Sequence, residues 1–294
     1  MSGGSEEKSI SVVGLGNMGS ALADALLSNG FSIAVWNRTV SKATPLIERG
    51  ATLAQNVAEV AGMSDVMIIC VAEHSVIKLL LYNDGVAEAM HGKCLMQLGV
   101  VTAEEAHETA NWAQAHGIDY LEGSILGLPI SIAAGEATIV CSGSREQYDE
   151  QKPILEVFGS THHLSDSIGA AYQFDKMMYP FGCGAYLGFI QGAAMAKASG
   201  YSIETYTNIL LEWMKPLPGK LENFGSLIRN EDFTAHQASL AVWVDVYEKS
   251  LGVCQSLEVD DSLPNAHMAM LRKGIADGYG EEEIIAIYKS VLPK

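Results

Sequence analysis

The chain is predicted to have an α/β fold in its first part and an all-helical fold in its second. Three observations support this prediction. Short β-branched runs alternate with helical stretches up to about residue 165, strand signals stop after that point, and a glycine-rich turn links the first strand to the first helix. The 294 residues are enough for one large core or two ordinary ones. We therefore expect one domain over residues 1–165 and a helical domain over residues 166–294.

Seven short runs in the first part are typical of buried strands. In chain order they are SISVVGLG, FSIAVWN, DVMIICVA, KCLMQLG, IDYLEG, ATIVCSG and THHLS. Ala- and Leu-rich segments such as GSALADALLSNG lie between them. This alternation predicts βαβ units and a mostly parallel sheet.

The second part carries helical patterns only. One helix of about 30 residues is expected over residues 166–198, with Pro180 inside it. A second long helix is expected in DFTAHQASLAVWVDVYEKSLGVCQSL, because its apolar residues recur at three- and four-residue steps. Two shorter helices are expected, one after Ser262-Leu263-Pro264 and one in GEEEIIAIYKSVL.

The glycine-rich turn reads Gly14-Leu15-Gly16-Asn17-Met18-Gly19 and opens an alanine-rich helix. Glycines at these positions permit a tight turn, let the backbone approach a pyrophosphate, and let the helix pack closely on the strand. Free N–H groups and the positive end of the helix then favour the anion. The turn predicts a Rossmann domain that binds a dinucleotide; the alternative is a glycine turn that has lost its ligand.

The second predicted strand ends on Asn37-Arg38-Thr39, where an NAD-binding domain commonly has an acid. An acid there would repel a 2′-phosphate, whereas Arg38 can bind that phosphate with two hydrogen bonds. Asn37 and Thr39 are expected to add neutral hydrogen bonds, and Lys42 a second positive charge. NADPH is therefore favoured over NADH; the alternative is that Arg38 is only a solvated surface charge.

Composition and the lack of certain motifs argue against several other classes of protein. The formal net charge of −17 would repel a nucleic acid, so none is expected as a partner. No apolar run of about 18 residues predicts a membrane span, and the first eight residues lack the apolar core of a signal peptide. The five cysteines form no CxxC pair and the histidines no HExxH, so neither a metal nor a disulfide framework is expected. These features are typical of a cytoplasmic protein.

The chain resembles the β-hydroxyacid dehydrogenase superfamily, which includes 6-phosphogluconate dehydrogenase. The resemblance rests on GLGNMG, on VWNRTVSKA and on the large helical second part. Its hydroxyacid members bind the substrate carboxylate through a D-A-P-V-S-G-G stretch. The matching stretch here runs from Glu122 to Leu128 and has Leu126 at the serine position. Those members also carry a catalytic lysine in a G-x-x-x-x-x-K-x-x-N pattern. Counting from Gly169, Asp175 stands at the lysine position.

A carboxyl group at that position is what imine reductases and reductive aminases show, and SIGAAYQFDKMMY resembles their G-x-A-x-x-x-D segment. The chain is therefore identified as similar to that family. The resemblance implies NADPH-dependent reduction of C=N bonds in cyclic imines or iminium ions, with reductive amination as a further activity. It also implies an intertwined, domain-swapped homodimer in which residues around 205–245 of one chain share the cleft of the other chain's Asp175.

The chemistry fits a carboxyl group at residue 175. Reduction of a C=N bond needs a hydride at carbon and a proton at nitrogen. A desolvated acid favours its protonated form and can donate that proton, or as an anion it can stabilise the iminium. Tyr179, four residues after Asp175, and Tyr172, three residues before it, are further candidate donors. A one-residue slip would instead make Lys176 a dehydrogenase lysine. Because a helix turns about 100° per residue, we expect that Asp175 and Lys176 do not both face the cofactor.

The remaining site residues are predicted along both parts of the chain. Reductive aminases show N-L-T-N or N-L-S-T where this chain has Gln97-Leu98-Gly99-Val100-Val101-Thr102, so we expect weak ketone–amine coupling and retained imine reduction. Further cofactor contacts are expected at Val71, Ala72, Val76, Leu98, Gly99 and Ser124, and substrate contacts at Gln97, Leu126, Trp213, Val242 and Trp243. Two other functions stay open: a hydroxyacid or aldehyde reductase that uses Lys176, and a nucleotide-binding regulatory protein without turnover, which would lack an open cleft.

Overall fold

The computed structural model describes residues 8–235 and 237–293, and the chain divides into two compact units, residues 1–179 and 180–294. The division falls inside the long helix α9 (Ala170–Ala198), whereas the sequence placed it at residue 165. The prediction about the polar start of the chain concerns residues that, apart from Lys8, lie outside the described ones.

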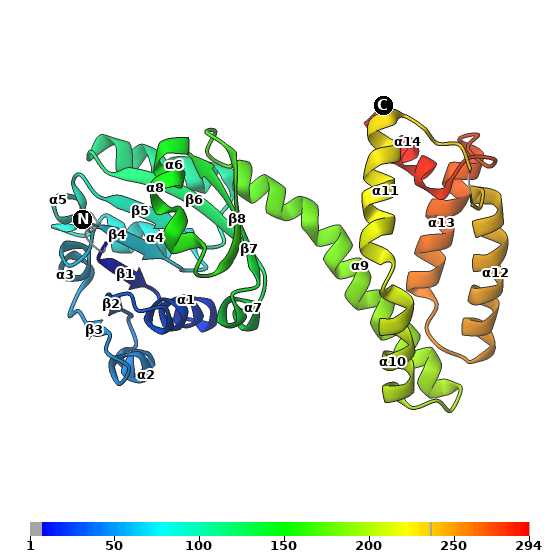
Figure 1. Ribbon diagram of the computed structural model, residues 1–294, viewed down its shortest axis with the longest axis horizontal. Coiled ribbons are helices and arrows are strands. Elements are labelled where there is room, and N and C mark those ends of the chain that lie inside the picture. Colours follow the sequence, from blue (N-terminus) through cyan, green and yellow to red (C-terminus); the bar gives the residue numbers. More distant parts are fainter. Residues whose placement is uncertain (1–7, 236, 294) are drawn as a thin grey trace, which may run out of the picture. The chain divides into compact units, whose positions relative to one another are not determined.

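The first unit contains an eight-stranded sheet in the order β3-β2-β1-β4-β5-β6-β7-β8 (Figure 1). The strands are β1 Ile10–Val13, β2 Ile33–Trp36, β3 Thr52–Leu53, β4 Val66–Ile69, β5 Cys94–Gln97, β6 Asp119–Leu126, β7 Ala137–Gly143 and β8 Gly159–Ser165. All neighbouring strands are parallel except β6 and β7, which are antiparallel. The predicted α/β fold with a mostly parallel sheet is confirmed. Strand β3 has no counterpart among the predicted strands, because its two residues are too few to show an alternating pattern.

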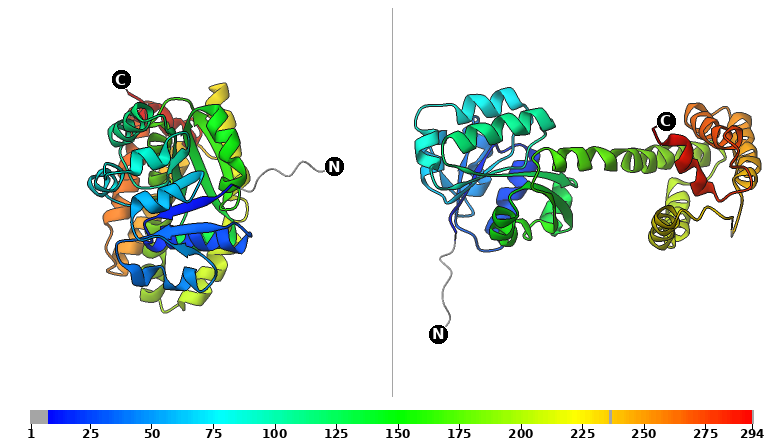
Figure 2. Two further views of the ribbon diagram at one scale, coloured as in Figure 1. Left: turned by 90° about the vertical axis from the view of Figure 1, so that its left-hand side faces the viewer. Right: turned by 90° about the horizontal axis from the view of Figure 1, so that it is seen from above.

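Helices cover both faces of this sheet (Figure 2). They are α1 Asn17–Ser28, η1 Val40–Lys42, α2 Thr44–Ile47, α3 Val57–Gly62, α4 His74–Leu81, α5 Val86–Met90, α6 Ala103–Ala115, α7 Pro129–Ala134 and α8 Arg145–Leu155. Val12 of β1 packs in one buried cluster with residues of α1, α7 and α8, and Val13 packs in the opposite cluster with residues of α3 to α6. Successive side chains of a strand point to opposite faces, so a central strand with a helix layer on each side is apolar throughout.

The strand register brings three loops to one edge of the sheet. Val13 at the end of β1 is level with Trp36 at the end of β2 and with Ile69 at the end of β4. The residues that follow, Gly14 among them, therefore lie at the same carboxyl edge. The chain passes from β1 to β2 on one side, while β4 pairs on the other side, and ligands of such sheets bind where the strand order reverses in this way.

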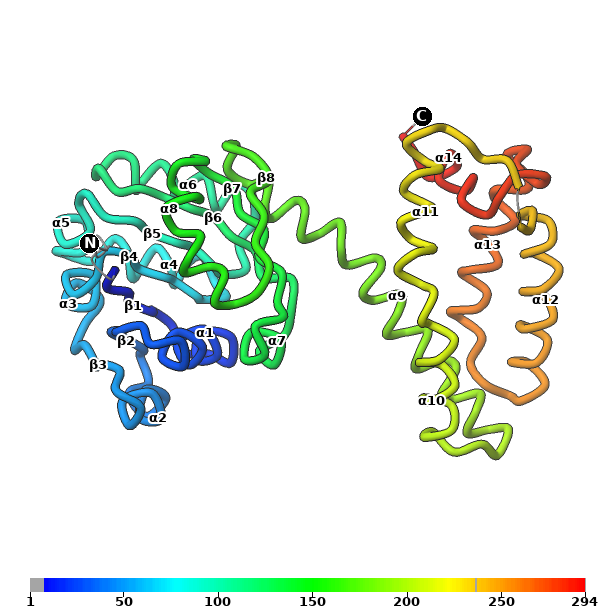
Figure 3. The backbone as a smooth tube through the Cα atoms, in the orientation of Figure 1, coloured from blue at the N-terminus to red at the C-terminus, as the bar shows by residue number. Residues whose placement is uncertain are grey.

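The second unit contains the rest of α9 and the helices α10 Ile203–Met214, α11 Leu217–Asn230, α12 Leu240–Ser256, α13 Ser262–Ala276, η2 Ile284–Ala286 and α14 Ile287–Val291. Helices α12 and α13 lie side by side (Figure 3). The long helix predicted over residues 166–198 has 29 residues and includes Pro180. None of the helices in the described ranges has the length and apolar character needed to cross a membrane.

The second long helix is shorter than the sequence pattern predicted. It begins at Leu240 and not near residue 232. The Leu240 N–H donates to the Glu282 carbonyl, and Ser239 forms an isolated β-bridge with Glu283. This pairing with a segment 40 residues away holds the chain before α12 in an extended form, and a local apolar pattern does not reveal it. The sequence analysis also named no separate helices where α10 and α11 lie.

Candidate active site

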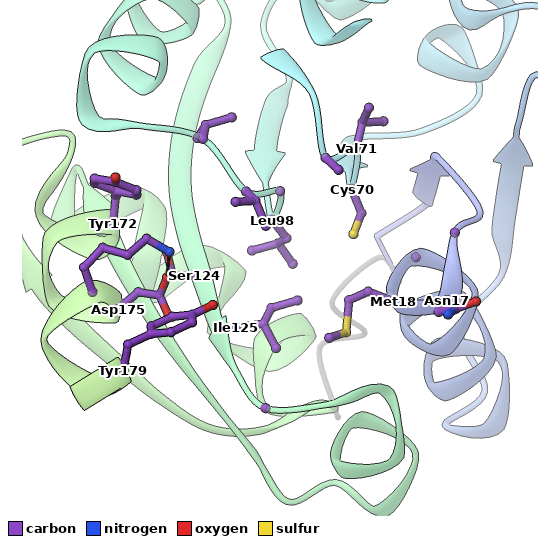
Figure 4. Close-up of a pocket in the computed structure, with 18 residues that line it drawn as sticks. Asn17, Met18, Cys70, Val71, Leu98, Ser124, Ile125, Tyr172, Asp175 and Tyr179 are labelled. Carbon is purple, nitrogen blue, oxygen red and sulfur yellow. Dashed lines mark hydrogen bonds and ion pairs between the residues drawn. The ribbon is translucent and has the colours of Figure 1, made fainter. Parts of the chain in front are cut away.

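A cavity of about 340 Å³ opens at the carboxyl edge of the sheet in the first unit (Figure 4). Of the residues predicted from the sequence, the cavity is lined by Gly16, Asn17, Met18, Gly19, Val71, Ala72, Leu98, Gly99, Ser124, Tyr172, Asp175 and Tyr179. Its lining also includes Cys70, Val100, Val101, Ile125, Gly127 and Lys176. The glycine-rich turn thus shares one cavity with the first turns of α9, more than 150 residues later in the chain.

Glycine is found at each of three positions of the turn for a different structural reason. Gly14 has φ +94°, and a Cβ there would lie 2.5 Å from the Cys70 carbonyl oxygen. A Cβ on Gly19 would lie 1.9 Å from the Gly14 carbonyl oxygen, so only glycine lets α1 start this close to β1. A Cβ on Gly16 would meet no atom within 4 Å. The space above Gly16 is therefore open, at the N-terminus of α1, and this is the arrangement that accepts a pyrophosphate.

Asn37 holds the turn in place. Its side-chain oxygen accepts a hydrogen bond of 2.9 Å from the Leu15 N–H, and its amide nitrogen donates to the Thr39 carbonyl at 2.9 Å. The sequence analysis expected Asn37 to bind a 2′-phosphate directly. In the structure its side chain connects the glycine-rich turn with the end of β2, and its contact with a 2′-phosphate stays a prediction.

A second hollow, of about 530 Å³, adjoins the end of β2. It is lined by Trp36, Asn37, Arg38, Val40, Leu53, Ala54 and Gln55, with no carboxylate among them. Arg38 and Lys42 are exposed, and neither side chain makes a hydrogen bond or an ion pair with another residue in the described ranges. The Arg38 guanidinium is therefore available for an anion, and it has the planar geometry that binds a phosphate through two hydrogen bonds.

The α9 side of the cavity carries all three predicted catalytic residues (Figure 4). The Asp175 side chain is 15% exposed, and its Oδ2 lies 2.6 Å from Lys176 Nζ. That ammonium lies 5.1 Å from the ring centre of Tyr172 and 4.6 Å from that of Tyr179. The expectation that Asp175 and Lys176 would not both face the cavity is wrong, because the long lysine side chain folds back to its neighbour between the two rings.

Lys176 stays charged in this setting. Burial by itself lowers the pKa of its ammonium. The hydrogen bond and the negative charge of Asp175 outweigh burial, with further contributions from Tyr179 and Tyr172, so the pKa of Lys176 is raised above its ordinary value of 10.5. At neutral pH the residue is therefore a cation beside the Asp175 carboxyl group.

Several predicted residues lie outside this cavity. Gln97 is fully buried, and its side-chain oxygen accepts a hydrogen bond of 3.1 Å from the Tyr120 hydroxyl. Leu126 pairs with Thr138 on β7, and Val76 lies in α4. None of Gln97, Leu126 and Val76 is among the lining residues.

The substrate residues predicted in the second unit lie on two helices. Trp213 is exposed on α10 and Val242 on α12. The Trp243 ring lies 5.1 Å from Lys220 Nζ. Their predicted role in a substrate wall stays a prediction.

Glu122 is the site residue that the sequence reasoning named without giving it a role. It is 1% exposed on β6, and its carboxylate accepts hydrogen bonds from the backbone of Gly169 and Tyr172 at the start of α9. The sequence signal was an acid, Glu122, inside the apolar part of a predicted strand, beyond the exposed Asp119 at its start. No group of three His, Cys, Asp or Glu side chains that could hold a metal ion occurs among the residues the structure describes.

Comparison with known proteins connects these features to a family. The protein-family model described as the NAD binding domain of 6-phosphogluconate dehydrogenase matches residues 9–169. A second family model, described as the NADPH-dependent reductive aminase-like C-terminal domain, matches residues 167–292. An NADPH-dependent reductive aminase of Aspergillus oryzae is 27% identical, over 95% of this chain and 96% of that protein.

Two solved structures are similar over nearly the whole chain. An imine reductase from Myxococcus stipitatus in complex with NADP+ has a TM-score of 0.86 and 29% identity, covering 96% of this chain and 99% of that one. A reductive aminase from Aspergillus terreus in complex with NADPH and ethyl levulinate has a TM-score of 0.88 and 27% identity, covering 97% and 99%. The chain therefore belongs to the proteins with a nucleotide-binding domain of the 6-phosphogluconate dehydrogenase type, carries a reductive aminase-like C-terminal domain, and is homologous to reductive aminases and imine reductases.

Proposed function

We propose that this protein is an NADPH-dependent imine reductase that converts cyclic imines or iminium ions to amines. The observation that carries the proposal is the single cavity that contains both the glycine-rich turn and the Asp175 side chain. A nucleotide-binding protein without turnover would not need an acid in that position. The relatives in complex with NADP+ and NADPH support the same cofactor here.

The residues present fit NADPH. The open space above Gly16 and the N-terminus of α1 would hold the pyrophosphate, and Arg38 with Lys42 would hold the 2′-phosphate. Asn37 would keep the turn in the required shape through its bond to Leu15. When bound, this cofactor supplies the hydride that the imine carbon receives.

The protein's own contribution is control of charge and protons at the imine nitrogen. The Asp175 carboxyl group faces the cavity and would stabilise the positive charge of the iminium as an anion, or deliver a proton as an acid. The Tyr179 hydroxyl, one helical turn later on the same wall, is a second donor, and the Tyr172 hydroxyl is a third. The Lys176 ammonium balances the charge of Asp175 when no cationic substrate is present.

Coupling of a ketone with an amine is proposed to be weak. The two polar side chains expected at the end of β5 and in the segment after it both have other partners. Gln97 is buried against Tyr120, and Thr102 caps α6 by accepting a hydrogen bond from the Glu105 N–H. Neither side chain lines the cavity. We therefore propose that a preformed imine is the better substrate and that a ketone is poorly held for attack.

We also propose that the protein is a cytoplasmic, domain-swapped homodimer. Ala171 is the one buried residue of the 29 in α9, and apolar side chains such as Phe181, Tyr186 and Ile190 are exposed on it. Large exposed apolar surfaces commonly mark a protein interface. A partner's helical unit would cover this surface and complete the substrate wall that Trp213, Val242 and Trp243 were predicted to form.

A second candidate is a β-hydroxyacid-type reductase that uses Lys176, and one observation favours it: Lys176 lines the same cavity. NADPH absorbance of the purified protein separates the two functions, because imine reduction consumes NADPH and hydroxyacid oxidation forms it. We expect turnover with 2-methylpyrroline and a dihydroisoquinoline, and none with short 3-hydroxyacids in the NADP+-reducing direction. Turnover of hydroxyacids alone would contradict the proposal and support the second candidate.

A further inference from the structure

Glu122 is a buried carboxylate that the proposed chemistry does not use. It lies on β6 directly opposite Ser142 of β7, and its Oε2 accepts a hydrogen bond from the Ser142 hydroxyl. The same oxygen accepts a hydrogen bond of 2.6 Å from the Gly169 N–H, and Oε1 accepts one of 3.2 Å from the Tyr172 N–H. Three hydrogen-bond donors thus converge on this one buried side chain.

These contacts complete the hydrogen bonding at the N-terminus of α9. The Ser142 hydroxyl oxygen accepts from the Ala171 N–H at 3.2 Å, and the Ser167 carbonyl accepts from the Ala170 N–H at 3.4 Å. All four N–H groups from Gly169 to Tyr172 thus have an acceptor, whereas a helix alone leaves them unpaired.

Gly169 itself has no side chain to act as a cap. Its φ is +89°, and a Cβ there would lie 2.8 Å from the Ala103 Cβ. The usual capping residue is therefore replaced by a strand pair, Glu122 and Ser142, from an earlier part of the chain. The Glu122 carboxyl group also lies at the positive end of a 29-residue helix.

We propose that Glu122 is a positioning residue, which fixes the first turns of α9 against β6 and thereby places Asp175 in the cavity. Ser124 and Ile125, just after Glu122 on β6, line one wall. Tyr172, whose N–H binds Glu122, and Asp175, one turn later, line another. The Glu122 carboxylate therefore joins two walls of the same cavity. The catalytic consequence of this inference rests on the proposed function, whereas the structural anchor does not.

Glu122→Gln tests the anchor with little change in volume. The amide keeps one acceptor but turns an NH2 group toward a backbone donor, so one N–H at the start of α9 loses its partner. Amide hydrogen exchange, followed by mass spectrometry, measures this loss of a hydrogen-bond partner directly. We expect the amides of residues 169–175 to exchange about tenfold faster than in the wild type, with no change in residues 14–19. Glu156→Gln, at the exposed glutamate that directly follows α8, is the matched control and should change neither segment.

Unchanged exchange at residues 169–175 in Glu122→Gln would overturn the anchor. If Glu122→Gln does not fold, Ser142→Ala removes only the Ser142 hydroxyl from the same cap and gives the same test. Because exchange is measured without turnover, a wild-type protein that fails to reduce imines would refute the proposed function alone.

Kinetics test the link to Asp175. Glu122→Gln should lower kcat for 2-methylpyrroline about tenfold or more, with the NADPH dissociation constant unchanged within about twofold, because small misplacements of a reacting group are costly. In an Asp175→Asn background the same substitution should leave the residual kcat unchanged within about twofold. An equal fractional loss of kcat in both backgrounds would contradict a role through Asp175. A loss of stability with kcat per binding site unchanged would show that Glu122 is only structural.

Discussion

The Asp175 carboxylate and the Lys176 ammonium lie 2.6 Å apart and line one cavity, although they are neighbours on the same helix. The lysine ammonium lies near the aromatic rings of Tyr172 and Tyr179, which precede and follow the pair by one turn. The helix therefore presents an acid with its own counter-ion, and a cationic substrate would compete with Lys176 for the carboxylate.

The contribution of the Asp175–Lys176 pair to the stability of the protein should depend on pH in the alkaline range. The pKa of Lys176 is raised above 10.5 in the folded protein, so the pair's contribution is complete below pH 10.5 and is lost as pH rises through the folded pKa. Because the Lys176 side chain is 38% exposed, the contribution is at most about 1 kcal/mol. We expect Lys176→Met to lower the unfolding temperature by a constant amount from about pH 7 to 9 and by less above pH 10.5. Thermal unfolding of both proteins across this range checks it, and a difference that grows above pH 10.5 would contradict it.

Alanine at two glycines of the turn should change the unfolding free energy to different extents and weaken NADPH binding at both positions. In Gly19→Ala the new methyl group meets the Gly14 carbonyl oxygen, so we expect a loss of about 1–3 kcal/mol of unfolding free energy, together with loss of NADPH binding. In Gly16→Ala the methyl group meets no protein atom, so unfolding free energy should change by less than about 1 kcal/mol. NADPH affinity should still fall about tenfold or more, because the methyl group takes the space of the pyrophosphate.

Urea unfolding and NADPH fluorescence titration measure these two effects separately. If Gly16→Ala binds NADPH as tightly as the wild type, the open space above Gly16 is not the pyrophosphate site.

Arg38 should decide between the two nicotinamide cofactors. Its guanidinium is exposed and has no partner in the described ranges, so Arg38→Ala removes only what it offers to a ligand. We expect the KM for NADPH to rise about 10- to 100-fold and the KM for NADH about threefold or less. Arg38→Lys keeps the positive charge but loses the two parallel N–H donors of the guanidinium. Its KM for NADPH should therefore lie between the values of the wild type and Arg38→Ala. Equal increases for both cofactors would show that Arg38 does not contact the 2′-phosphate.

Much of the first unit could be predicted because its signals are local. The strand runs are apolar throughout, since β1 and β4 are covered on both faces, and the glycine-rich turn has a sequence of its own. The second unit was harder, since the start of α12 depends on pairing with residues near Glu282. A pattern of apolar spacing carries no information about such a distant contact.

The site was predictable in outline and less so in detail. Asp175 and Tyr179 could be placed by counting along one helix, but the position of Lys176 depends on how a long side chain folds. Gln97 looked available as a polar residue after an apolar strand, yet the Tyr120 hydroxyl holds it in the core. The role of Glu122 could not be seen, because its partners at Gly169 and Tyr172 lie about 50 residues away.

The Asp175 carboxyl group is proposed to serve the imine nitrogen. The most direct test of this role is the steady-state rate of 2-methylpyrroline reduction by wild type and Asp175→Asn, with the NADPH dissociation constant measured in parallel. We expect kcat to fall about 100-fold or more, as removal of a proton donor or a charge stabiliser does, while NADPH binding stays within about twofold. Full activity of Asp175→Asn on the imine would contradict this role of the carboxyl group.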